Sequence, residues 1–144
     1  MNYSTIHPAA PSSADAHPAA RWLGRLLGAA VTLVLLADGA VNLFVPHLLA
    51  QQMAATGFSA AQSFSLGVVM VACAVLYALP RTCVLGAILV TGFLGGAICA
   101  HFRLGAIASP PQIVCLAIGI AAWAGLWLRM DAMRALIPLR ATRS

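Results

Sequence analysis

The sequence predicts an all-α, polytopic membrane protein built as a bundle of four transmembrane helices, and two observations support this fold class. First, 62% of the 144 residues are hydrophobic and only 8% are charged, with a mean hydropathy of +0.94. Soluble domains carry about 25% charged residues, so this composition excludes an ordinary soluble enzyme or binding domain. Second, the chain contains four apolar runs of about 20 residues, the length that a helix needs to cross the hydrocarbon core.

The predicted spans are bounded by residues that start or stop helices. Ser59 and Gln62 form a capping-box pattern at the start of the second span, in which the hydroxyl and the amide each satisfy a free backbone N–H. Pro80 ends that span, and Ser109 followed by Pro110 is typical of a helix start. The four predicted spans are residues 24–45, 60–79, 83–102 and 110–128.

The rest of the chain forms short loops and two tails, so one domain is expected. Residues 1–20 are rich in Ala, Pro, Ser and His and have no hydrophobic period, which predicts a disordered cytoplasmic tail. The transmembrane domain then covers residues 21–130, and a short basic tail covers residues 131–144. Residues 47–56 fit either a short helix lying on the membrane surface or a polar loop.

The distribution of arginines predicts how the bundle is oriented. Cytoplasmic flanks of membrane proteins keep an excess of positive charge, and Arg103 falls on the opposite side of the membrane from the other arginines. Both termini are therefore expected on the cytoplasmic side of the membrane. The amphipathic rings of Trp22, Tyr77, Trp123 and Trp127 lie near the same boundary. The arginines on the expected cytoplasmic side are Arg21, Arg25, Arg81, Arg129, Arg134, Arg140 and Arg143.

Small residues at four-residue spacing predict where the helices touch, because helices in lipid associate through close backbone approach. Gly24 with Gly28 and Gly92 with Gly96 show this spacing, and Gly125 continues an Ala-rich series of the same spacing in the fourth span. The third span is the richest in glycine and is expected to be the central helix. The lipid bilayer is the expected partner of this bundle, with a homo-oligomer as an open alternative. No nucleic-acid partner is expected, because the formal charge of +5 comes from membrane flanks.

Asp38 is the charged side chain that lies well inside a predicted span. An ionised carboxylate in hydrocarbon costs roughly 2.5 to 3.5 kcal/mol on insertion scales, so such a residue is a functional candidate. Asn42 lies one helical turn further along, and His101 and Arg103 end the third span at a similar depth. These four residues are expected to form a polar cluster within the membrane.

Two interpretations of this cluster stay open. In the first, the cluster handles protons or binds a headgroup, such as a quinone carbonyl or an anionic lipid. In the second, Asp38 and Arg103 form a buried ion pair that fixes the first helix on the third. If Asp38 instead faces lipid, the cluster does not exist.

No catalytic residue and no metal site is predicted. The chain contains no Glu and no Lys, so acid-base chemistry has few side chains to draw on. The four cysteines show neither a C-x-x-C motif nor a zinc-ligand spacing. A disulfide between Cys99 and Cys115 is an open alternative, because both lie at comparable depth near the expected outer face.

Several segments resemble the signature of DoxX-like membrane proteins. They include LPRTCVLGAIL at 79–89, TGFLGGA at 91–97 and AHFRLG at 100–105, together with DG at 38–39 and WLR at 127–129. The resemblance implies a small four-helix protein of the bacterial inner membrane. It also implies a link to quinone-coupled sulfur oxidation or to membrane-bound antioxidant complexes, in which wider relatives act as small membrane subunits.

One position departs from the family pattern, because many members carry a lysine where this chain has Asn42. Without that cation, Arg103 or His101 becomes the expected counter-group of Asp38. The resulting hypothesis is an accessory membrane subunit of a quinone-linked or redox-associated complex, without catalysis of its own and with a membrane or soluble redox partner. The alternatives are a non-catalytic scaffold or stress protein and a small oligomeric transporter.

Overall fold

The computed structural model describes residues 18–136, and this part of the chain is all-α, without strands. Four of its helices are long and apolar enough to cross a membrane, which confirms the predicted fold class. Large apolar side chains such as those of Phe64 and Ile120 are exposed on the outside of the bundle, where lipid would cover them. The elements are α1 (Pro18–Phe44), the 3-10 helix η1 (Pro46–Leu49), α2 (Ala50–Thr56), α3 (Ala60–Ala78), α4 (Cys83–Arg103), α5 (Pro110–Arg129) and α6 (Asp131–Leu136).

The helix boundaries follow the predicted spans closely, with one difference at the N-terminal side. Helix α1 begins at Pro18, so residues 18–20 are helical instead of belonging to the predicted tail. The predicted segment 47–56 is helical, formed by η1 and α2, which decides between the two interpretations of this region. Residues 1–17 and 137–144, which carry most of the two predicted tails, lie outside the described residues.

Local side-chain hydrogen bonds explain where α3 and α5 begin. Ser59 and Gln62 form the predicted capping box, with the Ser59 backbone N–H donating to Gln62 Oε1 at 2.6 Å. The same arrangement of Ser109 with Gln112 opens α5, where the corresponding distance is 3.0 Å. Each box satisfies two backbone N–H groups that would otherwise lack partners at a helix start.

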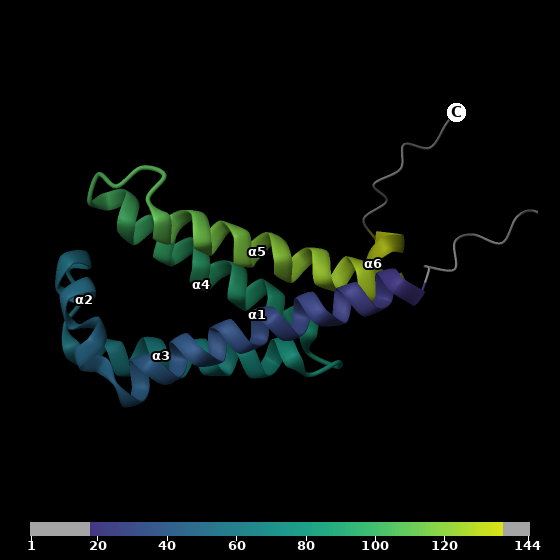
Figure 1. Cartoon of the computed structure of the whole chain (residues 1–144), viewed down its shortest axis with the longest axis horizontal. Helices are drawn as coiled ribbons and strands as arrows, with labels where there is room; N and C mark the ends of the chain where they lie inside the picture. The colour runs from purple at the N-terminus through teal and green to yellow at the C-terminus, as the bar shows by residue number, and fades with distance from the viewer. Residues whose placement is uncertain (1–17, 137–144) are drawn as a thin grey trace, which may run out of the picture.

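The four long helices form a ring in which α1 contacts α3 and α5, and α4 contacts the same two helices from the other side (Figure 1). Helix α1 therefore lies diagonally opposite α4. The expectation that the third span is central is not met, because α4 has the same number of long-helix neighbours as α1. The shared core of this ring includes Val31, Leu35, Tyr77, Val90 and Leu126.

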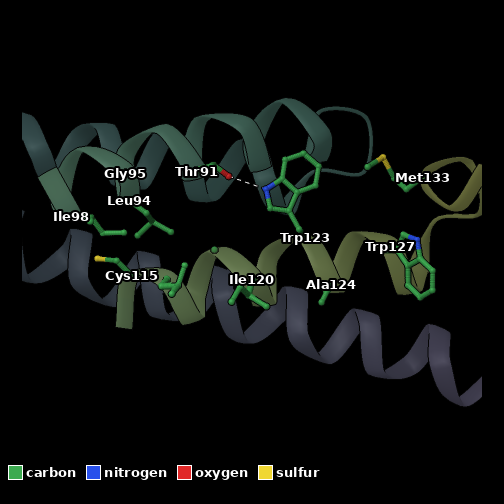
Figure 2. A pocket seen from close by; sticks show the side chains of 12 residues that line it. Thr91, Leu94, Gly95, Ile98, Cys115, Ile120, Trp123, Ala124, Trp127 and Met133 are labelled. Atoms are coloured by element: carbon green, nitrogen blue, oxygen red, sulfur yellow. Dashed lines mark hydrogen bonds between the residues drawn. The ribbon is translucent and has the colours of Figure 1, made fainter. Parts of the chain in front are cut away.

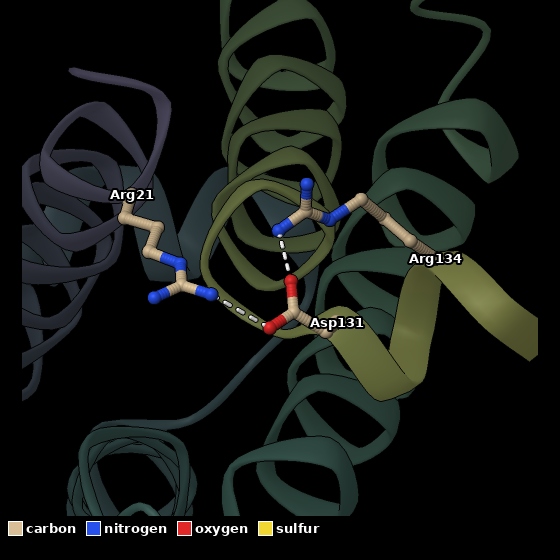
Figure 3. Close-up of polar contacts among 3 residues, drawn as sticks. All are labelled: Arg21, Asp131 and Arg134. Atoms are coloured by element: carbon tan, nitrogen blue, oxygen red, sulfur yellow. Dashed lines mark hydrogen bonds and ion pairs between the residues drawn. The ribbon is translucent and has the colours of Figure 1, made fainter. Parts of the chain in front are cut away.

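One end of the bundle carries the start of α1 together with α6, and we call it the terminal end (Figure 3). There Asp131 accepts hydrogen bonds from Arg21 at 2.8 Å and from Arg134 at 2.5 Å. The opposite end carries α2 and the α4–α5 loop, and we call it the distal end (Figure 1). Exposed ion pairs contribute little to stability. The ion pair of Arg21 with Asp131 therefore shows that α1 and α6 meet at this end, but it contributes little to holding them together.

At the terminal end, α1 touches α5 through glycines. A Cβ added to Gly24 would lie 2.8 Å from the backbone oxygen of Gly125, and one added to Gly125 would lie 3.3 Å from the nitrogen of Gly28. Next to this contact, the Tyr77 hydroxyl donates to the Ala122 carbonyl at 2.9 Å. The predicted roles of Gly24, Gly28 and Gly125 in packing thus correspond to one contact between two backbones.

Towards the distal end, α1 is closest to α3 instead. A Cβ on Gly39 would lie 3.4 Å from the backbone oxygen of Gly67, and one on Gly67 would lie 3.0 Å from that of Gly39. Beside them the Ser63 hydroxyl donates to Asn42 Oδ1 at 3.0 Å. Helix α1 therefore leaves α5 as it approaches α3.

Helices α4 and α5 form the second pair. The Trp123 indole N–H donates to the Thr91 hydroxyl at 2.9 Å (Figure 2), and the Gln112 amide donates to the Ile98 carbonyl at 3.3 Å. The α1–α3 pair and the α4–α5 pair diverge towards the distal end (Figure 1).

Gly92 and Gly96 do not make the helix contact that their spacing predicts. No heavy atom lies within 4 Å of the position that a Cβ would occupy on either residue. The reason is that both glycines lie on the part of α4 that faces the space between the diverging helix pairs. In this chain the same four-residue spacing therefore marks a contact in α1 and an opening in α4.

We expect Gly24→Ala to destabilise the bundle by about 1 to 3 kcal/mol, because the new methyl group would overlap the backbone of α5. The matched control is Gly96→Ala, which has open space around it and gains helix propensity of about 1 kcal/mol. Thermal unfolding in mild detergent, followed by circular dichroism, compares the two variants. Equal melting temperatures would contradict the assigned α1–α5 contact.

Candidate functional site: a cavity between the helix pairs

The divergence of the two helix pairs leaves a cavity of about 730 Å³ in the distal half of the bundle. All four long helices line it, and η1 and α2 add residues at its distal side. Small-molecule sites in proteins have volumes of about 300 to 1,000 Å³ and mostly apolar walls with a few polar groups. The cavity has both properties, and its apolar lining includes Leu35, Met70, Phe93, Val114 and Ile118.

Three of the four residues of the predicted polar cluster line this cavity. Asp38 and Asn42 come from α1, and His101 comes from α4. Gln52 of α2 adds a fourth polar side chain. The polar groups of the cavity thus come from different walls, while apolar side chains form most of its surface.

Asp38 is the anionic residue of the cavity lining, and its carboxylate has no hydrogen-bond or ion-pair partner among the described residues. Its side chain is exposed to the cavity instead of being packed against a neighbouring helix. The predicted buried ion pair with Arg103 is therefore not formed. An acceptor held without a partner at this depth is available to a ligand.

Asn42 has a structural environment that differs from that of Asp38. It is only 4% exposed, its amide donates to the Asp38 backbone carbonyl at 3.0 Å, and its oxygen accepts from Ser63. The first bond lies within α1, and the second connects α1 to α3, whereas the predicted cluster would have connected α1 to α4. Ser63, a serine inside an apolar span, was the sequence signal available for this contact, and it was not used in the prediction.

His101 presents one ring nitrogen to the cavity. Its Nδ1 lies 2.9 Å from the Ala97 carbonyl oxygen one turn earlier in α4. Because a carbonyl oxygen can only accept, Nδ1 carries the proton, and in the neutral ring Nε2 is a free acceptor. The cavity therefore has acceptors on two walls, the Asp38 carboxylate on α1 and His101 Nε2 on α4.

Arg103 does not belong to this cavity lining. One guanidinium nitrogen lies 3.4 Å from where a Cβ on Gly57 would be, so the side chain reaches the turn that follows α2. Gly57 adopts φ +78°, a left-handed conformation that ends α2 and favours glycine. Arg103 thus lies beside the distal turn and away from the other residues of the predicted cluster. The prediction groups it with them because its depth in the membrane is similar.

All four cysteines are free in the described part of the chain. Cys99 and Cys115 are both free, with Cys99 exposed on the outside and Cys115 lining the cavity. No group of three or more potential metal ligands occurs within residues 18–136.

Sequence reasoning missed two features of this site. Gln52 and Met53 reach the cavity because α2 folds across the distal end, and a hydropathy pattern does not place a surface helix relative to the bundle. The cavity itself depends on the angle between helix pairs.

Comparison with known proteins gives one match. The sequence profile of the DoxX-like family matches residues 26–125, which cover α1 from its third turn onwards through most of α5. No curated protein and no solved structure matches the chain.

We expect Asn42→Leu to lower the free energy of unfolding by about 0.6 to 1.7 kcal/mol, the range measured for hydrogen bonds between membrane helices. Asp38→Asn is expected to leave it unchanged or raise it, because no partner is lost and an ionised group is removed. Unfolding of both variants in mixed detergent measures this contrast. A larger loss for Asp38→Asn than for Asn42→Leu would mean that Asp38 has a structural partner.

Proposed function

Because this chain belongs to the DoxX-like family, we propose that it is an accessory membrane subunit that binds a quinone for a redox complex. Its role is to hold the quinone, and a membrane or soluble partner protein supplies or removes the electrons. The protein is a multi-pass membrane protein with four helices long enough to span the bilayer. The quinone itself is the cofactor of this proposal.

The observation that carries the proposal is the unpartnered carboxylate of Asp38 in an otherwise mostly apolar cavity. A quinol has two hydroxyl groups on opposite sides of a flat apolar ring. Asp38 and His101 Nε2 are acceptors on two different walls of the cavity, which matches this pattern of donors. In the oxidised form, a protonated Asp38 would donate to a quinone carbonyl.

The shortage of ionisable groups favours an accessory role. Asp38, His101 and Cys115 are the titratable side chains of the cavity lining. They can accept and return the protons of a quinol, but exchange of two electrons needs a redox partner. For this reason we assign binding and proton exchange to this chain and the electron transfer to a partner.

The cavity also favours a ligand-binding role over the alternatives. If the protein were a scaffold or stress protein without a ligand, we would expect a fully packed bundle. Such a bundle would not need an acid without a partner inside the membrane. A transporter of four spans needs further copies of the chain to line a path, since inverted-repeat transporters have more helices.

For the orientation, we propose that the terminal end faces the cytoplasm of a bacterial inner membrane. Arg21, Arg25, Arg81 and Arg134 lie at this end, whereas Arg103 lies at the distal end. Positive charge is retained on the cytoplasmic side. The cavity would then lie in the half of the membrane that faces the periplasm.

The first test of function is whether the protein retains and binds quinone. After purification in mild detergent, organic extraction should yield quinone, and calorimetric titration with a benzoquinol or naphthoquinol that carries one isoprene unit should show one site. Asp38→Asn should weaken quinol binding by about tenfold or more, because a hydrogen bond to a charged group contributes about 1.5 to 3 kcal/mol.

The matched control is Asp131→Asn, which removes the other acid of the described bundle but lies at the terminal end, away from the cavity. It should leave quinol affinity unchanged. Absence of bound quinone together with equal affinities of the two variants would remove the proposed function.

A second prediction concerns orientation. Single cysteines introduced into a chain whose four native cysteines are replaced report the side of the membrane through an impermeant maleimide. In intact spheroplasts, a cysteine in place of exposed Ile107 at the distal loop should react, and one in place of exposed Arg81 should not. The reverse pattern would place the terminal end outside and contradict the proposed topology.

A further inference from the structure

A second hollow runs along the outside of the α4–α5 pair (Figure 2). This groove has a volume of about 580 Å³ and extends from Ile98 and Cys115 towards Trp127 and Met133 at the terminal end. Residues 115 to 127 of α5 follow its length, which corresponds to roughly 18 Å at 1.5 Å per residue. The groove therefore follows α5 over about three turns.

The groove is apolar and faces the membrane. Leu116 and Ile120 on its rim are 58% and 62% exposed, so they lie where lipid would cover them. Gly95 and Gly119 widen it because they lack side chains, and no heavy atom lies within 4 Å of a Cβ position on Gly95. The Thr91 hydroxyl, the polar side-chain group on the α4 side of the groove, is occupied by the Trp123 indole.

The groove meets the distal cavity at two side chains. Leu94 of α4 and Cys115 of α5 line both hollows, so a single layer of side chains separates them. The Leu94 side chain lies 3.8 Å from where a Cβ on Gly119 would be, so a larger side chain at position 119 would contact Leu94. Both side chains are small or flexible, and their rotation would join the two hollows.

We propose that the groove binds the isoprenoid tail of the quinone whose ring occupies the cavity, and that the tail passes between Leu94 and Cys115. This inference rests on the proposed function. It specifies the ligand more closely, as a quinone with a tail of several isoprene units. A ring with polar edges fits the cavity with its acceptors, whereas a flexible chain of apolar isoprene units fits a groove whose walls are mostly apolar. The Trp127 indole N–H, which has no partner among the described residues, lies at the far, terminal end of that groove. Because Leu94 and Cys115 line both hollows, one ligand could occupy the two when these side chains rotate.

The route also explains how such a ligand reaches the cavity. A long isoprenoid tail cannot be buried in 730 Å³ together with its ring, so it must leave between two helices. Near Leu94 the membrane-facing groove comes closest to the cavity, and Gly95 and Gly119 leave room beside it. Because lipid is as apolar as the groove, moving the tail from lipid into the groove releases little hydrophobic free energy. The main effect of the groove is to fix the position of the tail.

The test compares two quinols in nanodiscs of phosphatidylcholine, one with a single isoprene unit and one with eight. Gly119→Leu fills the groove beside Leu94, and Ala37→Leu adds the same side chain on an exposed part of α1 outside both hollows. We expect Gly119→Leu to weaken binding of the long-tailed quinol by about tenfold or more, as an overlap with a bound group does. Binding of the short-tailed quinol should change by less than about twofold, and Ala37→Leu should affect neither.

A photoreactive long-tailed quinol provides an independent measurement. With a diazirine on its third isoprene unit, it should label residues 91–98 of α4 or 116–124 of α5, as identified by mass spectrometry of peptides. Labelling of α1 or α3, or equal affinities of Gly119→Leu and the unchanged protein for the long-tailed quinol, would overturn the inference. Retention of a phospholipid in the groove with no effect on quinol binding would overturn it as well.

The two proposals fail separately in this design. If the short-tailed quinol does not bind the unchanged protein, the proposed function fails. If it binds through Asp38 but tail length has no effect in Gly119→Leu, only the assignment of the groove fails.

Discussion

Helix α1 changes its closest partner along its length, and the shape of the bundle depends on this change. At the terminal end, Gly24 and Gly28 bring it against the backbone of α5, and further along Gly39 brings it against Gly67 of α3. A helix is too stiff to bend back towards both neighbours. Close packing at these two points therefore separates the helix pairs elsewhere, and the distal cavity is the space that results.

The polar groups inside the membrane divide into two classes. The Tyr77 hydroxyl, the Trp123 indole and the Asn42 amide all have partners within the bundle, as buried polar groups in lipid require. Asp38 differs from these groups, since its carboxylate lines the cavity and has no partner among the described residues. The buried nitrogens that also lack partners in this part of the chain lie towards the terminal end, and they belong to Trp127, Arg129 and Arg134. Departures from local rules are expected at functional sites, where a ligand supplies the missing interaction. By this criterion Asn42 has a structural role, because its hydrogen bond with Ser63 holds α1 against α3. Asp38, one turn away, is the candidate for ligand binding.

Features set by neighbouring residues could be predicted from the sequence, and features set by the angles between helices could not. The four spans followed from hydropathy, and the start of α3 followed from the Ser59 and Gln62 capping box. Depth along a span correctly grouped Asp38 with His101, because both line one cavity. Depth cannot give direction around a helix axis, so it also grouped Arg103, which turns towards Gly57. For the same reason, equal glycine spacing did not distinguish the contact of Gly24 from the open position of Gly92.

The contact of Arg21 with Asp131 joins the beginning of the described chain to its end. A ribosome releases α1 first and α6 last, so this contact forms only after every span has entered the membrane. Until α5 is inserted, Gly24 and Gly28 lack their contact with Gly125. Completion of the bundle therefore requires all four spans, and a chain shortened inside α5 would leave Gly24 and Gly28 of α1 without their backbone contact.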